Sequence, residues 1–170
     1  AEDGIRDDLV TGVQTCALPI LVVALPAEEM LELYECGIET VPGGRTRRDS
    51  VFNALKMLDE LSDDSWVMVH DGVRPCVRSS DILRLCEEVA DHEVGGILAV
   101  PVVDTLKRVD TADGRTVVAE TVDRSRLWAA LTPQLFRKGV LKQALESAGE
   151  VTDEASAVEA LGYKPLIIEG

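Results

Sequence analysis

The chain has 170 residues, the size of one domain with a substantial core. Its 31 acidic residues outnumber the 17 basic ones, giving a formal net charge of −14, and this balance argues against a nucleic-acid-binding surface. A small phosphate-bearing ligand is still compatible with it, because Arg45, Arg47 and Arg48 form a local basic cluster. The acidic excess leads us to expect no nucleic acid as a partner. We also expect no membrane, since no apolar run reaches the length of a membrane span.

The four cysteines show neither a CxxC pair nor the spacing of metal ligands. Unpaired thiols are typical of a reducing compartment, so we expect a cytoplasmic protein. The apolar stretch 16–25 follows acidic residues instead of a basic segment, which argues against a secretory signal peptide.

The first 20 residues do not fit the pattern of the rest of the chain. Residues 10–20 can be read, codon by codon, as the translation of a common sequencing-library adapter, and residues 1–7 resemble the translation of its outer primer. We therefore predict that residues 1–20 are not native protein sequence. The native part would then start near Leu21 and form a partial domain over residues 21–170.

From Leu21 onward, short apolar runs alternate with segments of helical periodicity. Strands are expected at 21–25, 38–41, 66–71 and 97–100, and helices at 28–35, from Asp49-Ser50 through Leu61, and from a Ser80 cap through Val89. Strands and helices that alternate at this length predict βαβ units, and hence a mostly parallel sheet with helices on both faces.

The alternation breaks after residue 101. Two polar strand-like runs, 105–109 and 116–121, flank Asp113-Gly114, and Asp-Gly between such runs is a strong hairpin signal. The hairpin is too polar for a core, so we predict a projecting arm over about residues 104–126 that packs against a second subunit. The alternation then resumes with a strand at 128–131, a helix around 140–145, a helix capped by Thr152 and a last strand at 165–168.

The most informative segment is the apolar strand that ends in His70 and Asp71 and is followed by Arg74. In open α/β sheets ligands bind at the carboxyl ends of the strands, so an acid and an arginine there suit a cation and a phosphate. A carboxylate at Asp71 could hold Mg²⁺, which prefers oxygen ligands together with substrate phosphates. The alternatives are that Asp71 only caps a turn, and that His70, a candidate base by residue type, is a hydrogen-bonded structural histidine.

Other polar residues stand at strand ends and helix starts. Gly43 and Gly44 lead into a helix, where a close backbone approach and free N–H groups could receive a ligand, although the arginines that follow could equally belong to a solvated loop. Further candidates are Thr105 and Arg124 at the two ends of the arm, Thr132 after a strand, and Thr152, for which capping alone is a sufficient role. No Ser/His/Asp order, HExxH or Walker loop is present, so hydrolase and ATPase functions have no support.

Together these segments closely resemble one family, the 2-C-methyl-D-erythritol 4-phosphate cytidylyltransferases of non-mevalonate isoprenoid biosynthesis. The resemblance runs from Leu21 to Gly170, and its motifs agree in order and spacing. They are Gly43-Gly44 with Asp49-Ser50-Val51, His70-Asp-Gly-Val-Arg-Pro75, Pro101-Val-Val-Asp-Thr-Leu-Lys-Arg108, Thr121-Val-Asp-Arg124, Leu131-Thr-Pro-Gln134 and Thr152-Asp-Glu-Ala-Ser156.

The resemblance implies a Rossmann-like α/β domain whose β-arm builds a homodimer, and transfer of a cytidylyl group from CTP to the phosphate of methylerythritol phosphate with Mg²⁺ present. It also implies residue roles. Asp71 corresponds to a catalytic position near the α-phosphate and metal, and Arg124 to a catalytic position that reaches into the partner subunit. The nucleotide-binding positions correspond to Gly43, Gly44, Ser50 and also Asp71, and the substrate-binding positions to Arg74, Thr105, Thr132 and Thr152.

The chain also departs from the family pattern. It has no counterpart of the glycine-rich P-A-A-G-x-G-x-R-M loop or of the N-I-K-x-T segment, and Arg45 stands where an acid is often found. We therefore expect an internal fragment, truncated at both ends, that is inactive by itself and destabilised by unpaired strand edges. The alternatives are a ribitol-phosphate-type cytidylyltransferase and a non-catalytic dimerisation fragment.

Overall fold

A computed structural model describes residues 20–25, 39–147, 149 and 151–170. Its elements are β1 (Val22–Leu25), β2 (Glu39–Pro42), α3 (Arg47–Lys56), β3 (Trp66–Val69), α4 (Ser79–Val89), β4 (Gly95–Pro101), β5 (Lys107–Ala112), β6 (Arg115–Thr121), β7 (Trp128–Arg137), α5 (Lys138–Ser147), α6 (Glu154–Ala160) and β8 (Leu166–Glu169). The helix expected at 28–35 and residues 1–19 lie outside the described residues.

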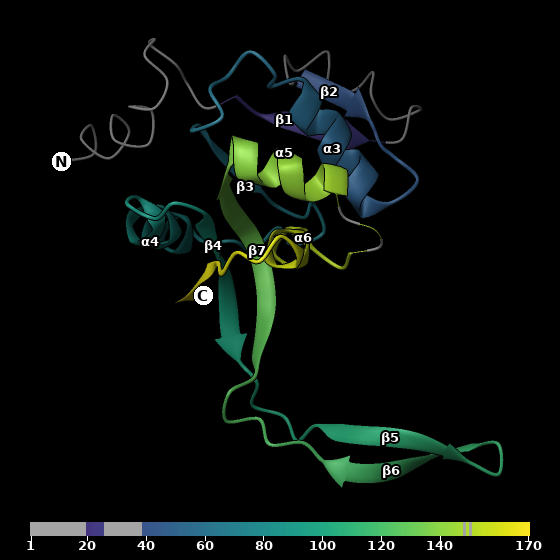
Figure 1. The fold of residues 1–170 in the computed structure, drawn as a ribbon. Helices are drawn as coiled ribbons and strands as arrows, with labels where there is room; N and C mark the ends of the chain where they lie inside the picture. The colour runs from purple at the N-terminus through teal and green to yellow at the C-terminus, as the bar shows by residue number, and fades with distance from the viewer. Residues whose placement is uncertain (1–19, 26–38, 148, 150) are drawn as a thin grey trace.

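The main sheet has four strands in the order β3-β7-β4-β8. β4 and β8 pair in parallel, whereas β7 pairs antiparallel with both β3 and β4, so three strands run in one direction and β7 runs opposite. The direction of β7 follows from the chain path, because the chain leaves the sheet after β4, forms the arm and returns beside β4 (Figure 1). The predicted α/β architecture is confirmed, with one returning strand that alternation alone did not predict.

A second, two-stranded parallel sheet consists of β1 and β2. Among the described strands, β1 is hydrogen-bonded only to β2, and β3 only to β7. Each of these strands therefore has one edge without a described partner. The loss of stability expected from such edges stays a prediction.

β7 is longer than predicted and extends to Arg137. The segment 132–134, expected in a loop after the strand, therefore lies inside it. The pairing of β7 with β4 is irregular here, with a register shift between Ile97 and Ala99. A proline is tolerated inside a strand at such an irregularity, because its missing N–H is not needed there.

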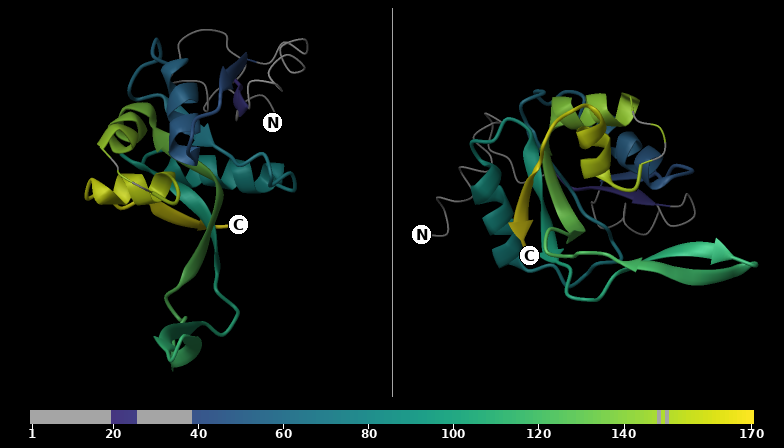
Figure 2. Two further views of the ribbon diagram at one scale, coloured as in Figure 1. Left: turned by 90° about the vertical axis from the view of Figure 1, so that its right-hand side faces the viewer. Right: turned by 60° about the horizontal axis from the view of Figure 1, so that its bottom comes forward.

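Helices cover both faces of the main sheet, as predicted (Figures 1 and 2). Ile97 of β4 and Phe136 of β7 join a core cluster with α3, α5 and α6, while their neighbours Leu98 and Leu135 join a second cluster with α4. Successive side chains of a strand point to opposite faces, so a strand covered on both sides is apolar throughout, as β4 is.

The predicted arm is an antiparallel hairpin of β5 and β6 that projects from the ends of β4 and β7 (Figure 1). Its turn residues Asp113 and Gly114 both have positive φ, 50° and 72°, as a two-residue hairpin turn requires. All residues of both strands are exposed, including Val109 and Val118. The arm thus adds no residue to the two core clusters of the described part of the chain.

Two predicted helix caps are wrong. α4 begins after Arg78, which makes no side-chain capping bond, and Ser80 lies inside the helix. α6 is capped by Asp153, whose carboxylate accepts the Ser156 N–H while the Ser156 hydroxyl accepts the Asp153 N–H, a reciprocal capping box. Thr152 therefore precedes the cap, and capping does not account for it.

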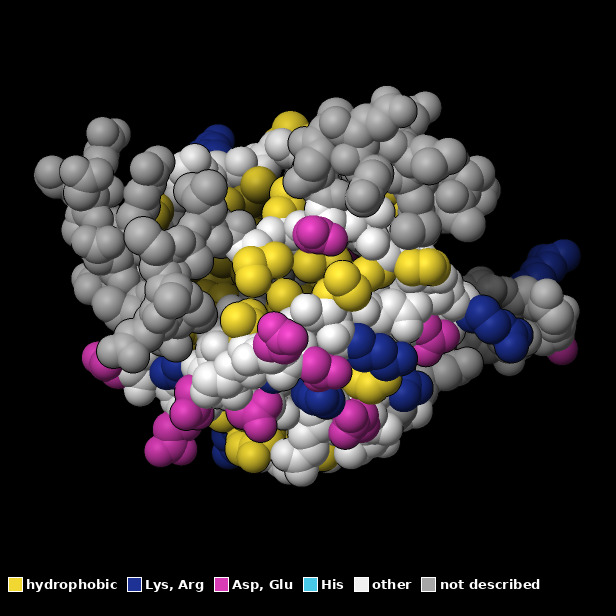
Figure 3. Space-filling model, turned by 90° about the horizontal axis from the view of Figure 1, so that it is seen from above, with side chains coloured by type: hydrophobic (Ala, Val, Ile, Leu, Met, Phe, Trp, Pro, Cys, Tyr) yellow, Lys and Arg dark blue, Asp and Glu magenta, His cyan; other side chains and the backbone are white. Residues whose placement is uncertain are grey.

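In the part of the chain that the structure describes, no helix combines the length and the apolar character needed to cross a bilayer. Seen from above the view of Figure 1, acidic and basic side chains lie interspersed around an apolar area (Figure 3). The acidic excess is thus spread over the described part of this face and not gathered in one block.

Candidate active site

A cavity of about 240 Å³ lies at the carboxyl end of β3. Four of the predicted site residues line it, namely Asp71, Arg74, Thr132 and Thr152. They come from three separate segments, the loop after β3, the middle of β7 and the segment before α6. The cavity therefore lies at a strand end, as expected from the sequence, although Thr132 itself lies inside β7. The other residues that line the cavity are Arg47, Ala130, Leu131, Gln134 and Asp153.

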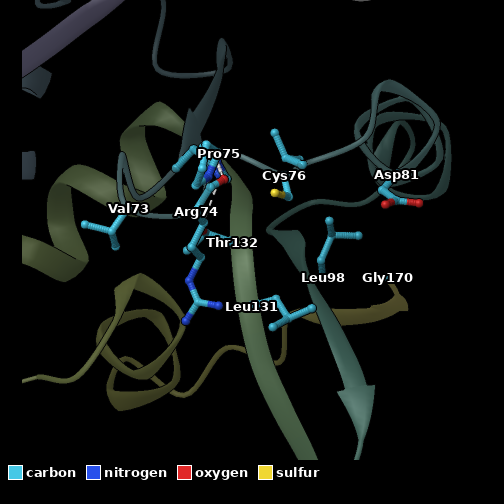
Figure 4. A pocket seen from close by; sticks show the side chains of 11 residues that line it. Val73, Arg74, Pro75, Cys76, Asp81, Leu98, Leu131, Thr132 and Gly170 are labelled. Carbon is cyan, nitrogen blue, oxygen red and sulfur yellow. Dashed lines mark hydrogen bonds between the residues drawn. The ribbon is translucent and has the colours of Figure 1, made fainter.

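A second cavity of about 360 Å³ adjoins the first and shares Arg74, Leu131 and Thr132 with it. In Figure 4 the Arg74 side chain extends alongside β7 near Thr132, with Cys76 and Asp81 across the cavity. The loop after β3 and the same part of β7 thus line both cavities.

Asp71 is held by two arginines. Its Oδ1 accepts hydrogen bonds from Arg47 Nε at 3.0 Å and Nη2 at 2.8 Å, and its Oδ2 accepts one from Arg74 Nε at 3.3 Å. Burial raises the pKa of Asp71, but the hydrogen bonds and charges of the two arginines outweigh burial and lower it below its ordinary value. The carboxylate does not cap the turn, since the Asp71 carbonyl, which accepts the Arg74 N–H, closes it.

Arg47 joins Asp71 to a buried acid on α6. Its Nη1 donates to Oε1 of Glu154 at 2.5 Å, and the Glu154 side chain is only 1 % exposed. Burial raises the pKa of Glu154, and the hydrogen bond and charge of Arg47 only partly offset this. The arginines that were predicted to form one basic cluster therefore have different roles. Arg47 lines the cavity, whereas the Arg48 side chain donates to the Leu145 carbonyl of α5 at 2.8 Å.

His70 is a structural histidine, as the alternative interpretation held. Its Nε2 lies 3.0 Å from the Arg74 carbonyl, which can only accept, so Nε2 carries the proton. Its Nδ1 lies 3.1 Å from Thr132 Oγ1, which in turn accepts the Asp71 N–H at 3.2 Å. The Thr132 hydroxyl is thus the donor to His70, and the chain of bonds fixes the loop that carries Asp71 and Arg74.

Three of the predicted nucleotide-binding residues, Gly43, Gly44 and Ser50, also lie together. The Gly44 N–H donates to Ser50 Oγ at 2.9 Å, and the Ser50 hydroxyl donates to the Thr46 carbonyl at 3.1 Å. Thr46 is the N-cap of α3, because its Oγ1 accepts the Asp49 N–H, so this helix begins earlier than expected. It also ends earlier, at Lys56 instead of Leu61. Gly43 donates to the Leu25 carbonyl at 2.7 Å and ties the loop to β1.

The structure does not bring Thr105 and Arg124 to this site. Both are exposed at the base of the arm, where Arg124 Nη1 donates to the Val103 carbonyl, and neither lines either cavity. Their predicted action on a partner subunit stays a prediction.

A family model described as IspD: 2-C-methyl-D-erythritol 4-phosphate cytidylyltransferase matches residues 10–170. The chain belongs to this family. A cytidylyltransferase of this name from Pseudomonas entomophila (strain L48) is 54% identical over 139 residues, which are 78% of this chain and 58% of the relative. The one from Thiobacillus denitrificans (strain ATCC 25259 / T1) is 50% identical over 146 residues, 84% of this chain and 60% of the relative. The chain thus spans less than two thirds of the length of these curated relatives.

Solved structures of the family share the fold. A crystal structure of 4-diphosphocytidyl-2C-methyl-D-erythritol synthase superposes with a TM-score of 0.78 at 39% identity, over 96% of this chain and 78% of that one. The Francisella tularensis 2-C-methyl-D-erythritol 4-phosphate cytidylyltransferase gives a TM-score of 0.76 at 36% identity, over 97% of this chain and 77% of that one. The Rossmann-like class predicted for the fold is that of these cytidylyltransferases.

The donor chemistry of Asp71 suits the Mg²⁺ expected for a cytidylyltransferase. Within the described ranges no group of three or more His, Cys, Asp or Glu side chains could hold a metal ion by itself. A Mg²⁺ ion that is bound to nucleotide phosphates needs only one or two protein carboxylates. Asp71 accepts three hydrogen bonds, and a carboxylate offers about four lone-pair positions, so one position is left for a cation.

Sequence reasoning missed two buried residues beside this candidate site. Gln134 is 1 % exposed, donates to Asp153 Oδ2 at 2.8 Å and accepts the Ala155 N–H at 2.9 Å, so it joins β7 to the start of α6. In the sequence, Glu154 has an ordinary explanation as an acidic residue in the first turn of a helix, where the helix dipole favours negative charge. Both stand in motifs that carry the family resemblance, which is the signal that could have pointed to them.

Proposed function

We propose that this chain is part of an enzyme that transfers the cytidylyl group of CTP to 2-C-methyl-D-erythritol 4-phosphate and releases pyrophosphate. The observation that carries the proposal is the cluster of Asp71, Arg47 and Arg74 at the strand-end cavity of a chain whose relatives bear this enzyme's name. A carboxylate beside guanidinium groups suits a metal-bound triphosphate and an incoming phosphate.

In this reaction an oxygen of the substrate phosphate forms a bond to the α-phosphorus of CTP, and the bond to the leaving pyrophosphate breaks. The attacking phosphate is already an anion, so no general base is required. Positioning and charge neutralisation then carry the rate. This agrees with His70, whose ring nitrogens are both engaged within the protein.

Each proposed role follows from the location of the residue. The loop of Gly43, Gly44 and Ser50 would receive the cytosine, with α3 N–H groups close by. Asp71 would hold Mg²⁺, which when bound neutralises phosphate charge. The proposed substrate-binding residues are Arg74, Thr132 and Thr152 at the cavity and Thr105 on the arm, with Arg124 as a catalytic cation supplied across the dimer.

A homodimer built by the arm is part of the same proposal, as is action in the cytoplasm. Exposed Val109 and Val118, on a hairpin whose strands are exposed along their whole length, support a protein partner there. Sedimentation of the wild-type chain and of Val118→Lys tests this, with a dimer expected only for the wild type. Monomers in both samples would contradict it.

Calorimetric titration of the chain with CTP and with ATP, each in the presence of Mg²⁺, tests the nucleotide specificity. CTP should bind more tightly by about tenfold, since a site that hydrogen-bonds one base leaves polar groups unpaired with another. Equal affinities would contradict the proposal. In the same solutions, pyrophosphate release in the presence of methylerythritol phosphate would support the reaction and overturn the expected inactivity of the fragment.

The ribitol-phosphate enzyme remains the alternative within the same chemistry. Competition between methylerythritol phosphate and ribitol phosphate for the CTP-bound chain distinguishes the two. A purely structural dimerisation fragment predicts dimers that bind neither nucleotide.

A further inference from the structure

We propose that Glu154 is a positioning residue for the Asp71 site, acting through the guanidinium of Arg47. This inference rests on the proposed function only in assigning nucleotide binding to the site. The contacts themselves are independent of that assignment.

The three side chains form one connected line across three elements. Glu154 is the first residue of α6, Arg47 the first residue of α3, and Asp71 follows β3. One edge of the guanidinium, Nε and Nη2, faces Asp71, while Nη1 faces Glu154 at 2.5 Å. A planar group bound at both ends cannot rotate without breaking one of these contacts.

The burial of Glu154 argues that this contact is more than a surface ion pair. The side chain is 1 % exposed, and no donor among the described residues reaches its Oε2. A buried carboxyl group with one unpartnered oxygen disfavours folding compared with an apolar residue of the same size. The same charge placed there orients Arg47, which is itself only partly buried and would otherwise sample several rotamers.

The charges of the site allow positioning to be separated from a simple electrostatic effect. Arg47 and Arg74 carry two positive charges, which Asp71 and Glu154 balance. The change Glu154→Gln removes one negative charge beside an anion site, which by itself strengthens the binding of CTP. If Glu154 positions Arg47, the same change weakens the binding of CTP, so the two effects have opposite signs.

The experiment compares wild type, Glu154→Gln and the control Glu159→Gln, which makes the same charge change at an exposed position of α6. NMR measures hydrogen exchange at Arg47 Nε, and calorimetry measures the affinity for CTP with Mg²⁺. A neutral acceptor binds a guanidinium about half as strongly as a charged one, so we expect exchange about fivefold faster and CTP binding about fivefold weaker in Glu154→Gln. Glu159→Gln should match wild type.

Unchanged Arg47 exchange in Glu154→Gln, or CTP binding as tight as that of the wild type, would overturn the proposal. If Glu154→Gln does not fold, Arg47→Lys serves instead, because it keeps the charge but lacks the planar fork. It should then weaken the binding of CTP, and unchanged affinity would count against positioning. If wild type itself binds no CTP, the proposed function fails, and Arg47 exchange still decides the role of Glu154.

Discussion

The tightest backbone approach in the candidate nucleotide-binding loop is at Gly44. A Cβ atom there would lie 2.1 Å from Asp49 Cβ, 2.7 Å from the Asp49 carbonyl carbon and 2.8 Å from Ser50 N. These atoms belong to the first turn of α3 and cannot rotate away. We therefore predict that Gly44→Ala displaces the start of this helix, lowers the stability of the fold and breaks the hydrogen bond from Gly44 to Ser50.

The size of the effect follows from the contacts. Forcing a methyl group into a packed site costs about 1–3 kcal/mol. For a small domain this lowers the urea midpoint by about 1 M. The lost hydrogen bond to Ser50 also disorders the loop that is proposed to receive the cytosine, so the affinity for CTP should fall by about fivefold.

Urea unfolding followed by circular dichroism gives the midpoint, and calorimetry gives the affinity. Gly72→Ala is the matched control for unfolding, because no described atom lies within 4 Å of a Cβ built at Gly72. Its free energy of unfolding should stay within about 0.5 kcal/mol of wild type. If Gly44→Ala unfolded at the same urea concentration as wild type and Gly72→Ala, the close-packing argument would be refuted.

Three further predictions concern ionisable groups. Asp71→Asn should abolish the dependence of CTP affinity on Mg²⁺, and titrations with and without Mg²⁺ that differ as they do for wild type would contradict this. Because burial raises the pKa of Glu154 above 4.5, this group favours the folded state at lower pH and its contribution is lost as the pH rises through the raised pKa. The stability of Glu154→Gln relative to wild type should therefore increase with pH, and a constant difference from about pH 4 to pH 8 would argue against it. Burial, and to a lesser extent the charge of Glu87, raises the pKa of the Cys86 thiol to about 11. At about pH 8, iodoacetamide should therefore label exposed Cys76 in the folded chain, and Cys86 only after unfolding. Peptide mass spectrometry identifies the labelled residue, and labelling of Cys86 in the folded chain would contradict the prediction.

Local patterns were sufficient to predict most of the described elements and the covered faces of the sheet, but not the bounds of α3 or the length of β7. The apolar run of β4 and the Asp113-Gly114 turn are governed by neighbouring residues, so period and turn chemistry predict them from the sequence. The course of β7 was not predictable in this way. Its proline reads as a strand end, and only the irregular pairing with β4 shows why the strand continues.

In the candidate site, too, the residues set by a local motif were predictable and the contacts between distant residues were not. Asp71 and Arg74 were predictable because they follow a strand in a single short motif. The contact between Arg47 and Glu154 joins residues 107 positions apart, and the local pattern around each has an ordinary explanation, a loop arginine and a helix-start acid. Only the fold, which brings the first residues of α3 and α6 near the end of β3, places the two side chains in contact.

The returning strand β7 has a consequence for any partner that binds the arm. It begins near the base of the arm at Trp128, passes the cavity at Thr132 and Gln134, and ends at Arg137, which pairs with Trp66 of β3. The strand that forms one wall of the cavity therefore also leads to the base of the arm, to which residues 122–127 connect it. A subunit that bound the arm would thus contact the chain at one end of the strand whose middle lines the site.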